Sequence, residues 1–240
     1  MRNGELPKHV GVVLDGNRRF ARKMGLANVG AGHRAGADKG EELIEWCDQL
    51  GIPVVTVWVL SVDNFRRAPE ELTEIFTIVE EKVAALGAAL EKTSKRRIRA
   101  VGRIELLPES TQQAIAKVEA ETAANEPYEL IIAVGYGGRE EITDAVRRMI
   151  ADHVRNGDSL EGIANGLEPD EIGRYMYAPD VPDPDLVIRT SGEVRLSGFL
   201  LWQTAYSEYY FCDVFWPEFR KIDFLRALRS YAQRQRRRGA

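Results

Sequence analysis

Four short segments of this 240-residue sequence gather the residue types that bind phosphate groups and divalent metals. They are residues 15–20 (DGNRRF), 61–67 (SVDNFRR), 135–139 (GYGGR) and 189–197 (RTSGEVRLS). Glycines let backbone N–H groups approach phosphate oxygens, and the planar fork of arginine binds a phosphate at two points. A carboxylate such as Asp15 could hold Mg²⁺, which often shares its oxygen ligands with phosphates. Together the segments predict a ligand with more than one phosphate group.

Each of these residues also has an ordinary structural explanation. Asp-Gly-Asn is a common turn sequence, Arg189 could form a structural ion pair, and His33 could be a histidine with its hydrogen bonds satisfied. Glu208 is an acid among aromatic residues and could simply be exposed. The functional interpretation therefore depends on whether the fold brings the segments together.

The elements that must position these segments are short apolar runs that alternate with amphipathic stretches. The apolar runs are residues 10–14, 54–60, 98–101, 130–134, 186–188 and 209–214. Several of them are rich in Val and Ile, as expected for strands that are covered on both faces. The stretches with helical spacing are residues 35–50, 70–91 and 140–150. This alternation predicts an α/β fold: one domain over residues 1–240, with a mostly parallel six-stranded sheet flanked by helices on both faces.

In such a sheet, ligands bind outside the carboxyl ends of the strands. All four segments follow predicted strands, so we expect them to share one edge of the sheet and to form one site there.

Composition narrows the class of protein. The net charge of −4 does not indicate nucleic acid or membrane as the main partner. The longest apolar run, residues 52–60, is too short to span a bilayer, and the N-terminus lacks a signal-peptide core, so we expect a cytoplasmic protein. No G-x-x-x-x-G-K-[ST] motif occurs, which argues against a P-loop ATPase or kinase. The arginine-rich C-terminus from Arg226 onward, taken alone, is typical of a solvated helix end.

At this point the sequence resembles a known family, the cis-prenyltransferases, also called undecaprenyl diphosphate synthase-like isoprenyl transferases. Residues 9–19 are similar to the family's first signature and residues 61–67 to its second. Residues 185–193, continued by 200–208, are similar to the third. The likeness runs over nearly the whole chain and is greatest to short-chain actinobacterial members that make Z,E-farnesyl diphosphate.

The resemblance implies a Mg²⁺-dependent transferase that condenses isopentenyl diphosphate with an allylic prenyl diphosphate to form a cis bond. It implies that Asp15 is catalytic and binds Mg²⁺, and that Asn64 is catalytic, in a proton relay. The residues it assigns to the allylic diphosphate are Gly16, Asn17, Arg18, Arg19, His33 and Arg67. Those it assigns to the isopentenyl diphosphate are Arg189, Arg195 and Ser197. Further substrate contacts are expected from Phe20, Ser61, Val62, Asp63, Phe65 and Leu196.

The resemblance also implies a homodimer, in which Glu208 reaches Mg²⁺ and Arg237 reaches a site across the interface. It implies an apolar tunnel between sheet and helix for the growing chain. The expected lining is Val57, Val59, Leu72, Phe76 and Val79.

The sequence departs from the family at the allylic site. Arg18 stands where many members have glycine, and Phe20 and Phe65 replace common tryptophans. An arginine that many members carry shortly before His33 is missing. Val59 stands where long-chain members tend to have alanine, so we expect a narrower tunnel and a short product such as (2Z,6E)-farnesyl diphosphate.

Other hypotheses stay open. One is a long-chain polyprenyl diphosphate synthase, and another is a non-catalytic scaffold subunit of the same fold, although such subunits have usually lost residues that correspond to Asp15 and Arg19. A nucleic-acid-binding protein that uses the basic tail is a third. We expect no nucleic-acid partner, and only a peripheral membrane contact through a lipid product.

Overall fold

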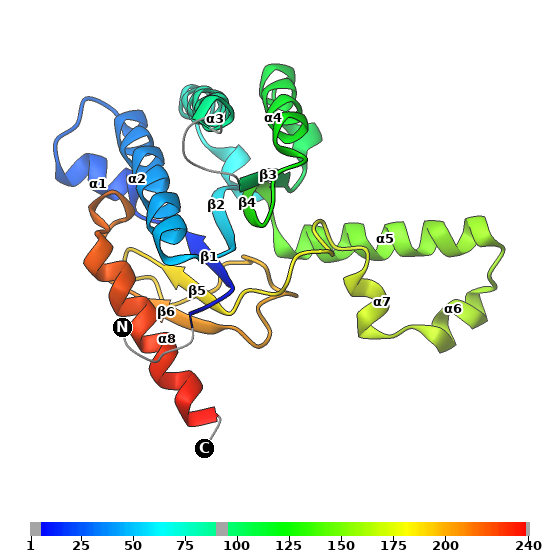
Figure 1. The fold of residues 1–240 in the computed structure, drawn as a ribbon. Coiled ribbons are helices and arrows are strands. Elements are labelled where there is room, and N and C mark those ends of the chain that lie inside the picture. The colour runs from blue at the N-terminus through cyan, green and yellow to red at the C-terminus, as the bar shows by residue number, and fades with distance from the viewer. Residues whose placement is uncertain (1–5, 90–95, 239–240) are drawn as a thin grey trace.

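The computed structural model describes residues 6–89 and 96–238, and it describes no side chains for residues 88–89 and 235–238. Its sheet has the strand order β3-β4-β2-β1-β5-β6, and all neighbouring strands are parallel. The strands are β1 (His9–Val13), β2 (Val54–Ser61), β3 (Arg96–Val101), β4 (Tyr128–Tyr136), β5 (Leu186–Arg189) and β6 (Glu208–Phe211). The α/β fold and the six-stranded sheet predicted from the sequence are confirmed (Figure 1).

The helices connect these strands. They are α1 (Asn17–Lys23), α2 (Val29–Leu50), α3 (Pro69–Ala89), α4 (Glu109–Thr122), α5 (Gly138–Asn156), α6 (Leu160–Gly166), α7 (Pro169–Gly173) and α8 (Lys221–Arg238), with short 3-10 turns η1 (Val62–Arg66), η2 (Ile104–Leu106) and η3 (Trp216–Glu218). Helix α2 begins six residues before the predicted start, because the side chain of Asn28 caps it by accepting a hydrogen bond from the N–H of Ala31 at 2.8 Å. Among the described residues, no helix is long and apolar enough to cross a membrane.

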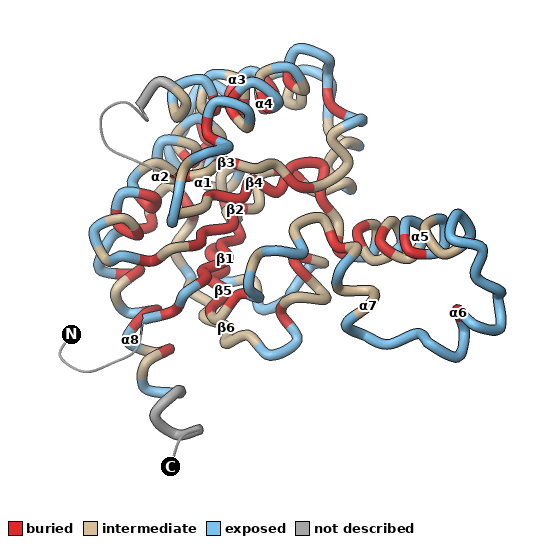
Figure 2. The backbone as a smooth tube through the Cα atoms, turned by 45° about the vertical axis from the view of Figure 1, so that its right-hand side comes forward, coloured by how far each residue is buried: buried red, intermediate tan, exposed pale blue. Residues whose placement is uncertain are grey.

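The two faces of the sheet are covered differently. Helices α2, α3, α4 and α8 pack on the face that presents Val10 and Val12. The opposite face, which presents Val13, carries a cluster of strand residues with Phe199, Leu200 and parts of the segment 177–181. Figure 1 shows α5 running away from the sheet, and Figure 2 shows the buried strands at the centre of the molecule. The expectation of helices on both faces is therefore corrected: loop segments take the place of helices on the second face.

A buried carboxylate explains why loops can cover that face. Glu141, at the start of α5, is 2% exposed. It accepts hydrogen bonds from the hydroxyl of Tyr136 at 2.5 Å, the N–H of Tyr177 at 2.9 Å and the side chain of Gln203 at 3.1 Å. In the cluster on the same face of the sheet, Trp58 and Phe199 stack with ring centroids 5.4 Å apart. These hydrogen bonds and the aromatic packing thus hold two irregular segments, those that contain Tyr177 and Gln203, against the sheet.

Arg96 fastens the start of β3 to the rest of the sheet. Its side chain is buried and donates to Asp48 at 2.7 Å and to the backbone carbonyls of Ile52 (2.8 Å), Pro53 (2.9 Å) and Glu129 (3.1 Å). These acceptors lie at the end of α2 and at the entries to β2 and β4.

Replacing Arg96 with methionine should lower the free energy of unfolding by roughly 3–5 kcal/mol, because it leaves a carboxylate and three carbonyls without their donor. Urea denaturation measures this difference. The control is Arg97→Met, since Arg97 is half-exposed on the same strand. Equal midpoints for the two variants would contradict the role assigned to Arg96.

Candidate functional site

A cavity of about 420 Å³ opens at the carboxyl ends of β1, β2 and β5. The expected site residues that line it are Asp15, Gly16, Asn17, Arg18, Arg19, His33, Ser61, Asn64, Arg67, Arg189 and Ser197. They come from three of the four sequence segments and from α2. The parallel sheet thus brings together residues that are up to 182 positions apart, from Asp15 to Ser197.

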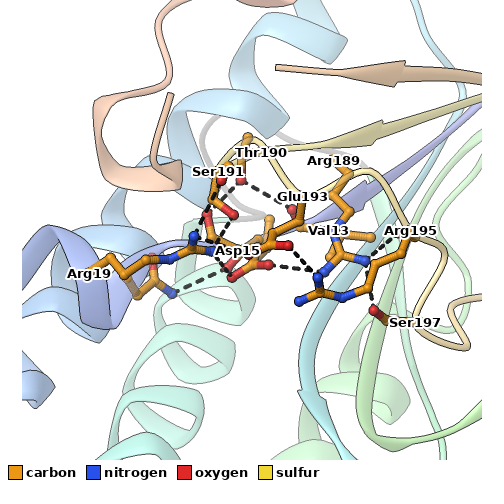
Figure 3. A network of polar contacts seen from close by, with 11 residues as sticks. Val13, Asp15, Arg19, Arg189, Thr190, Ser191, Glu193, Arg195 and Ser197 are labelled. Atoms are coloured by element: carbon orange, nitrogen blue, oxygen red, sulfur yellow. Dashed lines mark hydrogen bonds and ion pairs between the residues drawn. The ribbon is translucent and has the colours of Figure 1, made fainter. Parts of the chain in front are cut away.

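Asp15 lies at the centre of a polar network (Figure 3). Its two carboxylate oxygens contact different arginines: Oδ2 is 3.1 Å from Nη2 of Arg189, and Oδ1 is 3.4 Å from Nη2 of Arg19. Its backbone carbonyl accepts from the hydroxyl of Thr190 at 2.7 Å and from the N–H of Trp216 at 3.0 Å. The backbone and side chain of Asp15 are therefore both held by residues from the other end of the sequence.

The loop after β5 orients the arginines. Arg19 donates to the hydroxyl of Ser191 at 2.6 Å and pairs with Glu193 at 3.1 Å. Arg189 donates to the hydroxyl of Ser197 at 2.8 Å and to the backbone carbonyl of Arg195. Its side chain is 5% exposed, and its Nε is among the buried atoms that have no hydrogen-bond partner in the described part of the chain. A buried guanidinium with a spare donor beside a cavity suits an anionic ligand.

A second group of basic residues lies on the side of the cavity formed by α1, α2 and the segment between η1 and α3, which we call the helical side. Arg18 (α1), His33 (α2) and Arg67 (after η1) all approach Oε1 of Glu71, at 3.6, 3.0 and 3.1 Å respectively. Burial lowers the pKa of His33 below its ordinary value, although the hydrogen bond with Glu71 acts in the opposite direction. His33 is therefore mainly neutral at neutral pH and donates through Nε2, because a carboxylate only accepts.

The pKa of Glu71 is lowered as well, but for a different reason. Burial alone would raise it, but the hydrogen bond with His33 and the charges of Arg67 and Arg18 lower it below the usual range. Glu71 stays ionised, so this group combines two guanidiniums with one carboxylate.

Asn17, the first residue of α1, packs tightly against α2. A Cβ added to Gly36 would lie 2.4 Å from Oδ1 of Asn17, and one added to Gly32 would lie 2.4 Å from its backbone carbonyl. Oδ1 of Asn17 is buried and is another of the atoms for which the described residues provide no hydrogen-bond partner. Gly16, with φ of 114°, makes the left-handed turn that places Asn17 at the start of α1.

Asn64 is held at the mouth of β2. The N–H of Ser61 donates to Oδ1 of Asn64 at 3.3 Å in a capping box at the start of η1. This geometry turns both side chains toward the end of the strand, where they line the cavity.

Several expected residues do not line the cavity. They are Phe20, Val62, Asp63, Phe65, Arg195, Leu196 and Glu208. Asp63 is exposed, and Phe65 packs on Phe76 instead. Arg195 pairs with Glu193 at the rim. The side chain of Arg237 lies outside the described residues.

Glu208 occupies the opposite end of the sheet. It opens β6, pairs in register with Leu186 at the start of β5, and forms an ion pair with Arg234 at 2.8 Å. Asp15 and Glu208 therefore do not meet within one chain, and the expected role of Glu208 requires a second copy.

Asp15 can supply one ligand to Mg²⁺. Its carboxylate is 28% exposed and lines the cavity, and protein-bound Mg²⁺ is commonly held by one or two carboxylates together with substrate phosphates. In residues 6–89 and 96–238 no group of three or more His, Cys, Asp or Glu could hold a metal by itself. The donor set fits a metal that arrives with, or is completed by, a phosphorylated ligand.

The sequence prediction assigned no individual role to several residues of the site. Thr190 and Ser191 fix Asp15 and Arg19, and Trp58 and Arg22 line the cavity. Glu71 was also missed, although its position four residues after Arg67 in a first helical turn is a recognisable signal for an ion pair.

A small apolar cavity of about 90 Å³ adjoins the polar one. It lies between the sheet and helices α2 and α3, and the two cavities share Leu14 and Val59 in their linings. Of the expected tunnel residues, Val57, Val59 and Val79 line it. Lys82 and Glu41, which pair at 3.0 Å, also line it.

The substitution Gly36→Ala should weaken binding of inorganic pyrophosphate roughly tenfold or more, because the new methyl group displaces Asn17 from its place beside the cavity. Isothermal titration calorimetry measures the affinity. Gly40→Ala, one turn later in α2, is the control because its methyl group meets no atom within 4 Å. The same affinity in both variants would show that Asn17 does not need this position.

Comparison with known proteins identifies the family to which the chain is similar. Residues 13–239 match the family model described as putative undecaprenyl diphosphate synthase. A (2Z,6E)-farnesyl diphosphate synthase from Thermobifida fusca is 53% identical over 237 residues, covering 99% of this chain and 91% of the relative. A tritrans,polycis-undecaprenyl-diphosphate synthase (geranylgeranyl-diphosphate specific) from Methanopyrus kandleri is 51% identical over 246 residues, covering 100% and 87%.

The fold agrees with a solved structure. Lavandulyl diphosphate synthase from Lavandula x intermedia, in complex with dimethylallyl diphosphate, superposes with a TM-score of 0.88 at 35% identity and covers 95% of each chain. These matches confirm the resemblance stated from the sequence. The chain belongs to the undecaprenyl diphosphate synthase family of isoprenyl transferases, the cis-prenyltransferases.

Proposed function

We propose that this enzyme condenses isopentenyl diphosphate with an allylic prenyl diphosphate, with Mg²⁺ as its cofactor, to give a short product. The bond between the allylic C1 and its diphosphate oxygen breaks, and a carbon–carbon bond forms to the terminal methylene of isopentenyl diphosphate. A proton then leaves, a cis double bond results and pyrophosphate is released. One observation carries the proposal: Asp15 contacts Arg19 and Arg189, one from each of the two diphosphate-binding sets that the resemblance assigns.

The residues of the cavity suit this chemistry. Arg18, His33 and Arg67 would hold the allylic diphosphate, where negative charge develops as the C1–O bond breaks. Arg189 and Ser197 would hold the second diphosphate so that its double bond faces C1, which makes the step nearly unimolecular. Asn64 would lie at the reacting centre and help to remove the proton. Mg²⁺, held by Asp15, would neutralise the leaving diphosphate.

The short product is supported by the small size of the apolar cavity, which is about 90 Å³. Val59 and Leu14 contribute to both linings, and a packed interior yields little to a growing chain, so we propose a product of about 15 carbons. The Thermobifida fusca relative carries the name of such a synthase. Overall identity does not decide the length, since the undecaprenyl synthase of Methanopyrus kandleri is almost as similar.

We further propose a cytoplasmic homodimer in which Glu208 and Arg237 act across the interface. The position of Glu208 at the far end of the sheet supports this, because only a second copy could bring it near Mg²⁺. Contact with a membrane would be peripheral and would come through the lipid product, and no nucleic-acid partner is proposed. A scaffold role is disfavoured because Asp15, Asn17, Arg19 and Asn64 are all present in the cavity.

Incubation with labelled isopentenyl diphosphate, Mg²⁺ and geranyl diphosphate should give a product of about 15 carbons, since the cavity beyond Val59 is small. Chromatography of the dephosphorylated products measures chain length, and dimethylallyl and farnesyl diphosphate in separate reactions identify the preferred primer. EDTA should abolish turnover. If no primer yields product and EDTA makes no difference, the scaffold hypothesis replaces this one.

The substitution Val59→Ala should lengthen the product, because it removes two methyl groups where the cavities adjoin. Val55→Ala is the control: Val55 lies on the same face of β2 and is fully buried, but it does not line the apolar cavity. An unchanged product from the Val59 variant would remove the argument for chain length while leaving the reaction itself untouched.

A further inference from the structure

Glu71 lies next to the cavity without lining it. Its side chain is 11% exposed and projects from the first turn of α3. Three residues that do line the cavity, Arg18, His33 and Arg67, approach the same carboxylate oxygen, Oε1. One oxygen atom therefore accepts hydrogen bonds from His33 and Arg67 and forms an ion pair with Arg18, so it joins three separate segments of the chain.

These contacts leave the basic side chains with unused donors. Arg67 meets Glu71 through Nη1, Arg18 through Nε, and His33 through Nε2. A guanidinium has five N–H donors, so each arginine retains donors for a second acceptor on its cavity side. The arrangement can hold the side chains and still bind an anion.

Without Glu71 the same side chains would have little to hold them. Arg18 and Arg67 carry like charges near each other, and the side chain of Arg18 is 45% exposed. Repulsion and side-chain entropy would favour conformations that point into solvent. The partial burial of Glu71 makes its charge more effective at preventing this, because solvent screens it less.

We propose that Glu71 is a positioning residue that holds Arg18, His33 and Arg67 as a preformed binding surface for the allylic diphosphate. This rests on the proposed function, because it assigns that substrate to the helical side of the cavity. Glu71 touches neither substrate. Replacing Glu71 should therefore change the affinity for the allylic diphosphate and leave the affinity for isopentenyl diphosphate unchanged.

The substitution Glu71→Gln keeps the size of the side chain and removes its charge. It should raise KM for geranyl diphosphate roughly ten- to a hundredfold, because the donors lose their common anchor, while kcat and KM for isopentenyl diphosphate change little. Glu71→Asp keeps the charge but withdraws it by one methylene, and it should give an intermediate KM. Glu70→Gln is the matched control, since Glu70 is exposed in the same helical turn.

Three results would overturn the proposal. One is an unchanged KM for geranyl diphosphate. A second is a lower KM, which would make Glu71 a competitor of the substrate. A third is an equal rise in KM for both substrates, which would indicate a general structural defect. Thermal unfolding of each variant shows whether it is folded; if the Gln variant is not, the Asp variant decides by the same criteria.

A binding experiment separates this proposal from the proposed function. Geranyl thiolodiphosphate has sulfur in place of the bridging oxygen and ionises slowly, so its affinity can be measured by calorimetry without turnover. Weaker binding to Glu71→Gln than to the wild type and to Glu70→Gln supports the positioning role even if no condensation occurs. Equal binding in all three proteins refutes it even if the wild type is active.

Discussion

Mutual repulsion among basic side chains is the constraint that shapes this site. Arg18, Arg19, Arg22, Arg67 and Arg189 line one cavity together with His33. An empty site with this composition would lose its geometry unless negative charge were built into the protein. Three carboxylates supply it: Asp15 contacts Arg19 and Arg189, Glu71 contacts Arg18 and Arg67, and Glu193 contacts Arg19 and Arg195.

The fold meets this constraint by drawing the opposite charges from different elements. Asp15 follows β1, Arg189 ends β5, and Glu71 lies in the first turn of α3. In a parallel sheet all strand ends point to one edge, so each strand can deliver a charged segment without burying it in the sheet. The hydrogen bonds from Thr190 and Trp216 to the backbone of Asp15 then make its position depend on packing at the C-terminal part of the chain.

The same arrangement separates two environments that the proposed reaction needs. Charged groups gather at the strand ends, whereas the space between the sheet and helices α2 and α3 is apolar. Val59 and Leu14 belong to both. The ion pairs of Lys82 with Asp38 and Glu41 tie α2 to α3 near this space. A diphosphate and its hydrocarbon chain would thus each have a matching environment a short distance apart.

The sequence alone determined the class of fold, the family and most residues of the cavity. Strands reveal themselves locally, since each apolar run is continuous in sequence, and chemically active residues follow directly after them. The sequence could not determine which segments cover each face, because Glu141 anchors loops through contacts with Tyr177 and Gln203, which lie 36 and 62 positions away. Nor could it place Glu71 beside His33 and Arg18 or Glu208 at the far end of the sheet. Those positions depend on how helices pack and on strand register, which are set by long-range contacts, and only the tertiary structure decided them.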